Sequence, residues 1–277
     1  MSHFTVIVFG DDVEGQLTPY DEEIEAAPYF KKDEDWILKW GREKLPDIEN
    51  PTLEQIAKAV SSKDEKYEVR DGKIGHITTY NLLSKWDWYC VGGRWTGYFP
   101  LKKGRTGEVG SPGLMTSPAE PGYADIARLK DIDVARARRE AASEARKGFT
   151  MWQRIFEEHG KPESFESISG SGITIEKARE LFWKQPAVKA VSEARLSFGC
   201  PVEQFGFDRK AYVDKARDSA LVPFAYVVNG EWFERGKMGW FACVSDEKSM
   251  ELWQKQFQKV LDNTDPETFL TLVVCHI

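Results

Sequence analysis

Runs of apolar residues typical of β-strands stand near both ends of this chain, and the long middle stretch has a different pattern. The first run is Phe4–Phe9 (FTVIVF), which ends at Gly10, and the last is Phe269–Cys275. Successive apolar residues indicate a central strand that is buried on both faces. Residues 123–220 carry helical patterns instead. The economical prediction is an α+β fold, in which N- and C-terminal strands build one mixed sheet and a helical lobe is inserted between them.

The predicted organisation has three parts. Residues 1–122 form an N-terminal α+β part, residues 123–220 form the helical insertion, and residues 221–277 complete the same sheet. Strands of that sheet are expected near residues 4–9, 86–99, 224–234, 239–244 and 269–275. The expected helices are Asp33–Leu45, Thr52–Val60, Tyr123–His159, Ile175–Arg195 with a break at Pro186, Arg209–Ser219 and Asp246–Leu261.

Local signals define several of these boundaries. The dipeptides Asp71-Gly72 and Asn229-Gly230 predict tight turns of β-hairpins, because both favour positive φ angles. Thr52 is the expected N-cap of one helix, and Ser245 or Asp246 that of the last. Residues 102–122 are rich in Gly, Pro, Ser and Thr, which indicates a loop or linker.

The balance of charge limits the possible partners. Thirty-eight basic residues are mixed among 45 acidic ones, for a formal net charge of −7. Extended nucleic-acid binding needs clustered cations and is not expected. No apolar stretch approaches the roughly 20 residues of a membrane helix, and the N-terminus lacks the basic segment of a signal peptide. We therefore expect a cytoplasmic protein without a membrane partner.

The cysteines do not predict a metal site. Cys90, Cys200, Cys243 and Cys275 include no C-x-x-C pair, which zinc sites commonly use. Cys90, Cys243 and Cys275 lie in apolar, strand-like runs, where a thiol behaves as a small buried hydrophobe. We expect reduced, structural thiols.

Gly10-Asp11-Asp12 directly follows the first predicted strand. Carboxylates on a loop at the carboxyl end of a strand occupy a frequent position for functional sites. Asp11 and Asp12 are therefore candidates for binding Mg²⁺ or for acid–base chemistry. The alternative is a solvated turn, since Asp and Gly both favour turns.

The most aromatic segment of the chain is the Trp block, residues 86–95. Strand alternation would place Trp86 and Trp88 on one face and Asp87 on the other. Gly92 and Gly93 allow close approach of a ligand, Arg94 can bind a phosphate or carboxylate, and Trp95 can stack on a base. The alternative is a core strand with a glycine bulge, in which Arg94 pairs with Asp87.

A second segment of similar composition is the Gly block, residues 234–240 (ERGKMGW). It presents Glu234, Arg235 and Trp240 between two predicted strands, so its residues are also ligand-binding candidates. We expect the Trp block and the Gly block to adjoin, with Glu234 or Asp87 neutralising a buried Arg94.

His276 is the remaining catalytic candidate, because an unperturbed histidine titrates near neutral pH. Its neighbour Cys275 points to the other face of the strand and is not expected to be its partner. The alternative is an exposed terminal histidine. Cations of the long middle helix are expected on a solvated face, with Arg136–Glu140 and Glu144–Lys147 ion pairs.

Four segments of the chain resemble a family of uncharacterised bacteriophage and prophage proteins. They are Phe4–Asp12, Lys85–Gly97 (KWDWYCVGGRWTG), Glu234–Trp240 and Cys275–Ile277. The resemblance implies an accessory protein made in the cytoplasm of an infected bacterium. It carries no known reaction, catalytic residue or cofactor.

Two functions follow as expectations. The first is a phage-type accessory protein that binds and blocks a host factor, such as a defence protein. The alternative is a Mg-dependent or acid–base enzyme acting on a nucleotide or another phosphorylated substrate. In it, Asp11 and Asp12 bind metal or act as base, Arg94 and Arg235 hold an anionic ligand, and tryptophans stack on the base. No P-loop, dinucleotide fingerprint or hydrolase motif decides between them.

Overall fold

The first and last strands pair at the centre of the molecule. The computed structural model describes residues 2–33, 35–63, 65–114, 116–197 and 199–277. Strand β1 (His3–Phe9) runs antiparallel to β14 (Phe269–His276), with His3 opposite His276 and Phe9 opposite Leu270. Both strands are buried along most of their length. The α+β prediction, with a sheet built from both ends of the chain, is confirmed.

The main sheet is mixed. Its order is β11-β10-β1-β14-β5-β7, and β9 pairs with the start of β14. β1 is parallel to β10, whereas β14 is antiparallel to its neighbours. The hairpin predicted at Asn229-Gly230 joins β10 to β11, and both turn residues have positive φ (53° and 76°). The strands added here are β5 (Trp88–Gly93), β7 (Ser111–Pro112), β9 (Ile126–Arg128), β10 (Ala225–Val228) and β11 (Glu231–Glu234).

Each face of this sheet has its own core. On one face, Ile7 and Leu272 pack beneath helix α10 (Met250–Asn263), whose Trp253 and Phe257 are buried as their i, i+4 spacing predicts. On the other face, Val6 and Cys275 pack with helix α1 (Val13–Leu17) and with Trp86. Both ends of the chain therefore contribute to both cores.

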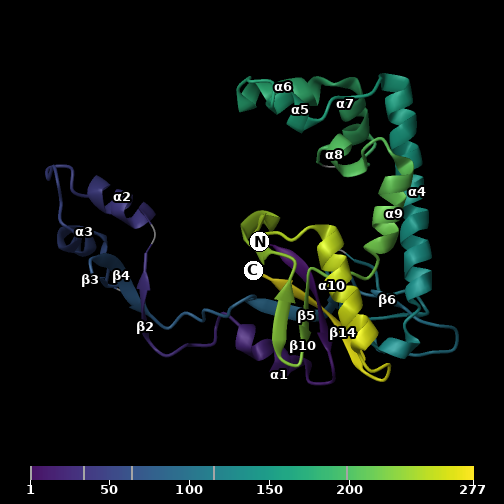
Figure 1. Cartoon of the computed structure of the whole chain (residues 1–277), viewed down its shortest axis with the longest axis horizontal. Coiled ribbons are helices and arrows are strands. Elements are labelled where there is room, and N and C mark those ends of the chain that lie inside the picture. The colour runs from purple at the N-terminus through teal and green to yellow at the C-terminus, as the bar shows by residue number, and fades with distance from the viewer. Residues whose placement is uncertain (1, 34, 64, 115, 198) are drawn as a thin grey trace.

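A small module projects from the sheet, at the left of Figure 1. Its core joins Ile37, Ile56 and Ile74, separate from the two cores of the sheet. Thr52 caps α3 through a capping box, and the predicted hairpin at Asp71-Gly72 joins β3 to β4. The elements of the module are β2 (Tyr29–Lys32), α2 (Asp35–Glu43), α3 (Leu53–Val60), β3 (Tyr67–Arg70) and β4 (Lys73–Thr78).

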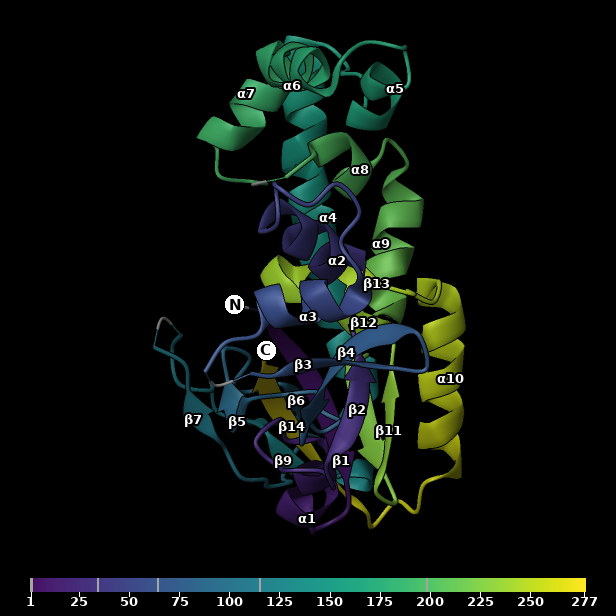
Figure 2. The same cartoon turned by 90° about the vertical axis from the view of Figure 1, so that its left-hand side faces the viewer.

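The inserted helices form an arm that extends away from the sheet in both views (Figures 1 and 2). Two of them, α4 and α9, pack along each other and connect the arm to the sheet. Trp152 is fully buried among Phe149 and Phe205 at the far part of α4. The helices are α4 (Val134–His159), α5 (Phe165–Ser169), α6 (Ile175–Lys184), α7 (Pro186–Glu193), α8 (Pro201–Phe205) and α9 (Arg209–Asp218).

The surface of the arm matches the expected solvated face. Arg136 pairs with Glu140 at 2.7 Å and Lys147 with Glu144 at 3.1 Å, as their spacing predicts.

Among the described residues, no helix is long and apolar enough to span a bilayer.

The long helix was predicted to start at Tyr123, and this is wrong. It starts at Val134, capped by Asp133, and the preceding residues form β8 (Tyr123–Ala124), β9 and a 3-10 turn. The reason is Asp125, whose buried carboxylate accepts hydrogen bonds from Thr96 Oγ1, Gly97 N, Tyr98 N and Gly110 N at 2.7–3.1 Å. These distant donors hold the segment extended, and β8 pairs with β6 (Phe99–Pro100).

The strand predicted near residues 239–244 is also wrong. A 3-10 turn (Trp240–Ala242) lies there between β12 (Lys237–Met238) and β13 (Val244–Ser245), which form a separate two-stranded sheet. Phe241 and Ala242 have positive φ (57° and 58°), which no strand allows. Helix α10 begins after Ser249, which is its N-cap in place of Ser245 or Asp246. Cys243 is consequently exposed; all four cysteines are free.

Candidate functional site

The start of the Trp block and the Gly block both lie near the chain termini, because Asp87 N donates to the His276 carbonyl and Ser2 Oγ to the Gly239 carbonyl. Lys85, which precedes the Trp block, forms a 2.7 Å ion pair with Glu234. Trp86 and Met238 belong to the same apolar cluster. The predicted contact is therefore present, but it runs through Lys85 and Trp86.

Arg94 takes no part in this contact. Its guanidinium is exposed and lies 5.8 Å from the ring of Trp95, with no carboxylate partner in the described part of the chain. The expectation of a buried Arg94 neutralised by Glu234 or Asp87 is wrong. Glu234 pairs with Lys85 instead, and Trp95 packs against the core beneath α10.

The glycines of the Trp block have a structural role. A side chain at Gly92 would place its Cβ 2.7 Å from Asp125 Oδ2, and Gly92 and Gly93 both have positive φ (82° and 52°). The chain reverses there and brings the backbone N–H groups of Gly97 and Tyr98 onto the Asp125 carboxylate. This sharp turn accounts for Gly92 and Gly93 without a ligand.

The expected alternation of Trp86 and Trp88 is wrong, because β5 begins only at Trp88. Trp86 is buried against Leu17 and Tyr89, and its Nε1 donates to the Leu17 carbonyl at 3.3 Å. Trp88 is 52% exposed beside His276. The two tryptophans therefore lie in different environments, Trp86 in an apolar core and Trp88 at the surface.

His276 is part of a polar cluster and not an exposed terminal residue. Its Nδ1–H donates to Asp87 Oδ1 at 2.6 Å, and its side chain is 15% exposed. Cys275 lies on the other face in the apolar cluster with Trp86, as expected. The carboxylate therefore orients the imidazole, an arrangement that suits general acid–base chemistry.

His3 completes this cluster and was not among the predicted site residues. Its ring meets the ring of His276 edge to face at 5.0 Å. Burial lowers the pKa of His3, and the nearby charges of Arg94 and His276 lower it further. The only signal in the sequence was a histidine near each terminus, which becomes informative once the register of β1 against β14 is known.

Asp11 and Asp12 lie at the opposite end of β1 from this cluster. Asp12 caps α1 by accepting from Gly15 N at 2.9 Å, and Asp11 is exposed. Arg235 lies near the terminal end, on the ring of Phe224, and pairs with Glu247 at 2.8 Å. The structure therefore does not bring Asp11, Arg94 and Arg235 to one cleft. In the described ranges, no cluster of His, Cys, Asp or Glu side chains has the geometry for a metal ion.

Beside the termini, a loop presents large aromatic side chains to solvent. Trp240 is 73% exposed and Phe241 is 80% exposed. Ser2 braces this loop, because its Oγ donates to the Gly239 carbonyl at 2.7 Å and accepts from Ala242 N at 2.8 Å. We call Trp240 and Phe241 the terminal aromatic surface.

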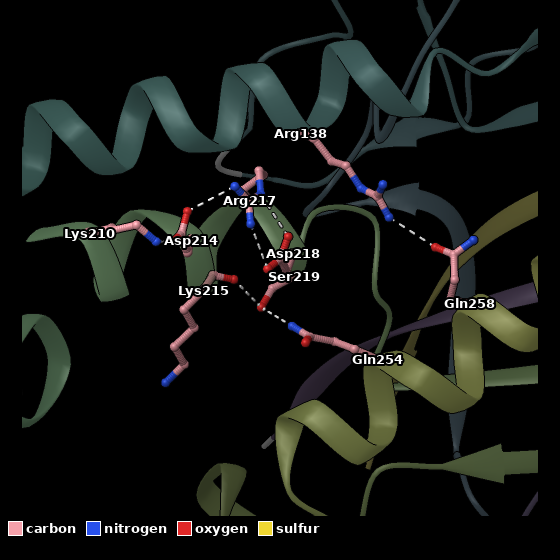
Figure 3. Close-up of polar contacts among 9 residues, drawn as sticks. All are labelled: Arg138, Lys210, Asp214, Lys215, Arg217, Asp218, Ser219, Gln254 and Gln258. Carbon is pink, nitrogen blue, oxygen red and sulfur yellow. Dashed lines mark hydrogen bonds and ion pairs between the residues drawn. The ribbon is translucent and has the colours of Figure 1, made fainter.

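A second candidate region is a groove of about 480 Å³ where the helical arm joins the sheet. Its walls are α4, α10 and the segment of residues 218–222. Figure 3 shows the polar contacts around it: Arg138 Nη2 donates to Gln258 Oε1 at 3.0 Å, and Gln254 Nε2 donates to Ser219 Oγ at 2.8 Å. The sequence could not show this groove, because its walls come from three distant segments.

Comparison with family models, with curated proteins and with solved structures finds no match to this chain. The resemblance to phage and prophage proteins stays a prediction.

Proposed function

We propose that this chain is a phage-type accessory protein that binds a protein of the host cell, such as a defence factor, and blocks its action. The observation that supports it is the exposure of Trp240 and Phe241 in a braced loop. Exposed Trp and other aromatic side chains that are held in place are the residues that contribute most binding energy at protein interfaces.

The backbone of this loop supports the same function. Phe241 and Ala242 adopt left-handed φ angles that non-glycine residues rarely take, and such conformations concentrate at functional sites. The side chain of Phe241 gains no burial from this conformation within the chain. Burial against a partner would offset the cost.

The surroundings favour a macromolecule over a small ligand. Trp88, opposite His276 on β14, is a further exposed tryptophan at this end of the sheet. The grooves at the small module, on the helical arm and at its base do not include Trp88, Trp240 or Phe241 in their linings. Exposed aromatic side chains outside these grooves suit a protein partner, whereas small molecules bind in concave sites.

The test is affinity purification from bacteria that make the tagged chain, followed by reconstitution with the purified partner. We expect the tagged chain to retain one host protein. The W240A/F241A variant should bind that protein with an affinity at least about tenfold lower than the wild-type chain. The matched control is W36A, since Trp36 is an exposed tryptophan of the distant small module. The partner's own activity falls when the wild-type chain is added and does not fall with W240A/F241A. Equal affinity of W240A/F241A and W36A, or an unaffected partner, contradicts the proposal.

The acid–base enzyme is a second candidate function, favoured by the 2.6 Å contact between His276 and Asp87. Arg94, which has no carboxylate partner in the described ranges, would attract a phosphorylated substrate to this cluster. The assay is turnover of a panel of nucleotides and sugar phosphates. D87N and H276Q abolish turnover in this case, while W240A/F241A retains it. Absence of turnover by the wild-type chain rules this candidate out.

A further inference from the structure

The groove at the base of the helical arm combines an apolar floor with a charged rim. Val134 of α4, Leu221 of the connecting segment and Phe257 and Leu261 of α10 line the floor. Its volume of about 480 Å³ is within the range of small-molecule sites. Unlike the terminal aromatic surface, it is concave.

The floor is not fully packed. The same four side chains also line a wholly apolar void beneath them, which reaches Ile7 of the sheet. A void of this kind leaves its lining atoms without contacts on one side. Leu221 also has a positive φ of 62°, unusual for a bulky residue. The void holds only about 10 Å³, too little for a ligand group, and an apolar group in the groove itself would instead remove part of Val134, Leu221 and Leu261 from water.

The rim carries two cations, Arg138 and Lys255, that form no ion pair in the described residues, although the charge of Arg138 also contributes to lowering the pKa of the Asp218 carboxyl. Arg138 donates to the amide oxygen of Gln258, whose own amide nitrogen is held by Asp262 at 2.7 Å. Lys255 stands on the same rim without an ion pair in the described residues. The guanidinium is thus held in place by a neutral group and keeps donors for an anion.

The acids of the rim are less available. Asp218 accepts two hydrogen bonds from Arg217, at 2.8 and 3.0 Å, and these bonds lower the pKa of its carboxyl (Figure 3). Glu251 remains as the other carboxylate at the groove. With the Arg217 that engages Asp218, three cations face the two carboxylates of this region.

We propose that this groove binds a small amphipathic carboxylate, with its apolar body on the floor and its carboxylate at Arg138 and Lys255. Its walls come from the helical arm and from the sheet. The ligand therefore bridges the two and stabilises the native chain by an amount that rises with the logarithm of its concentration above the Kd.

Three probes, compared by calorimetry and thermal shift, separate the contribution of the apolar body from that of the carboxylate. Decanoate has the apolar body and the charge, decanol has the body alone, and acetate has the charge alone. We expect decanoate to bind the wild-type chain and to raise its melting temperature. Decanol and acetate should each bind at least tenfold more weakly. Binding of decanol as tight as decanoate, or no binding of decanoate at submillimolar concentration, overturns the proposal.

The variants locate the site. R138Q/K255Q removes both rim charges, and R139Q/K259Q removes the same charge from the same two helices outside the groove. Circular dichroism verifies that both remain folded. R138Q/K255Q weakens decanoate binding at least tenfold, and R139Q/K259Q changes it less than twofold. Equal affinity of the two variants places decanoate elsewhere and refutes the assignment.

Discussion

At the scale of single residues, Asp125 has the largest structural effect. Its fully buried carboxylate accepts four hydrogen bonds, from the turn after the Trp block and from Gly110. A buried carboxylate is stable only when its oxygens are satisfied in this way. Gly92 is thus required by Asp125, and Gly93 by the close approach of Cys90 and Val274, so internal contacts explain two glycines that stood out as part of a ligand site.

We predict that Asp125→Ala destabilises the chain by about 3 kcal/mol or more, because it leaves buried donors without an acceptor. Chemical denaturation measures the loss. The control is D47A, which removes an exposed aspartate and changes stability by less than about 0.5 kcal/mol. Similar denaturation midpoints for D125A and D47A would show that the carboxylate is dispensable.

The His3 cluster predicts a dependence of stability on pH. The pKa of His3 in the folded chain is lowered from 6.5 by burial, Arg94 and His276, and only Asp87 opposes this. Below pH 6.5 the unfolded chain therefore binds more protons at this position than the folded chain, and stability falls as pH decreases toward the lowered value. His3→Gln makes the stability less dependent on pH in this window. An unchanged pH profile in H3Q contradicts the assignment.

At the scale of elements, the loop at Trp240–Ala242 depends on a residue that is distant in sequence. Ser2 makes two side-chain hydrogen bonds to it, in addition to the backbone bond from Gly239 N to the Cys243 carbonyl. We predict that Ser2→Ala weakens the loop by about 1 kcal/mol, seen as roughly fivefold faster hydrogen exchange of the Ala242 amide. The control S245A changes a serine of the neighbouring β13. If exchange is equally fast in both variants, the brace is unimportant.

Elements with local signals were predictable from the sequence, and elements held by distant contacts were not. Thr52 and Asn229-Gly230 contain their own capping and turn chemistry, and they lie where predicted. The start of α4 depends on Asp125 and its donors, and the turn at Trp240 depends on Ser2.

The candidate site, too, could be predicted from the sequence only in part. Aromatic and charged composition identified the region near the termini. It could not distinguish the internal turn around Arg94 from the surface at Trp240, or pair His276 with Asp87 and His3. The groove at Arg138 has no local pattern at all, since its walls meet only in the fold.

At the scale of the whole molecule, the small module is joined to the main sheet by two connecting segments that lie side by side. Its core is its own, and Ala26 N donates to the Thr79 carbonyl at 2.7 Å, so the two connections lie side by side. We predict that replacing residues 27–78 by a short Gly-Ser linker leaves the sheet and the arm folded. Circular dichroism and a cooperative thermal transition test this. Loss of cooperativity would show that the module stabilises the sheet.

The pairing of β1 with β14 also constrains how the molecule is made. A ribosome releases β1 and β5 long before it releases residues 269–276, which lie between them in the finished sheet. During elongation these two strands have an unfilled position beside them, and exposed strand edges of this kind favour aggregation. The arm and the small module contain their own local contacts, so they are able to form first. Closure of the central sheet is therefore a late event after translation of its last strand, and nascent chains waiting for that strand are the natural clients of a chaperone.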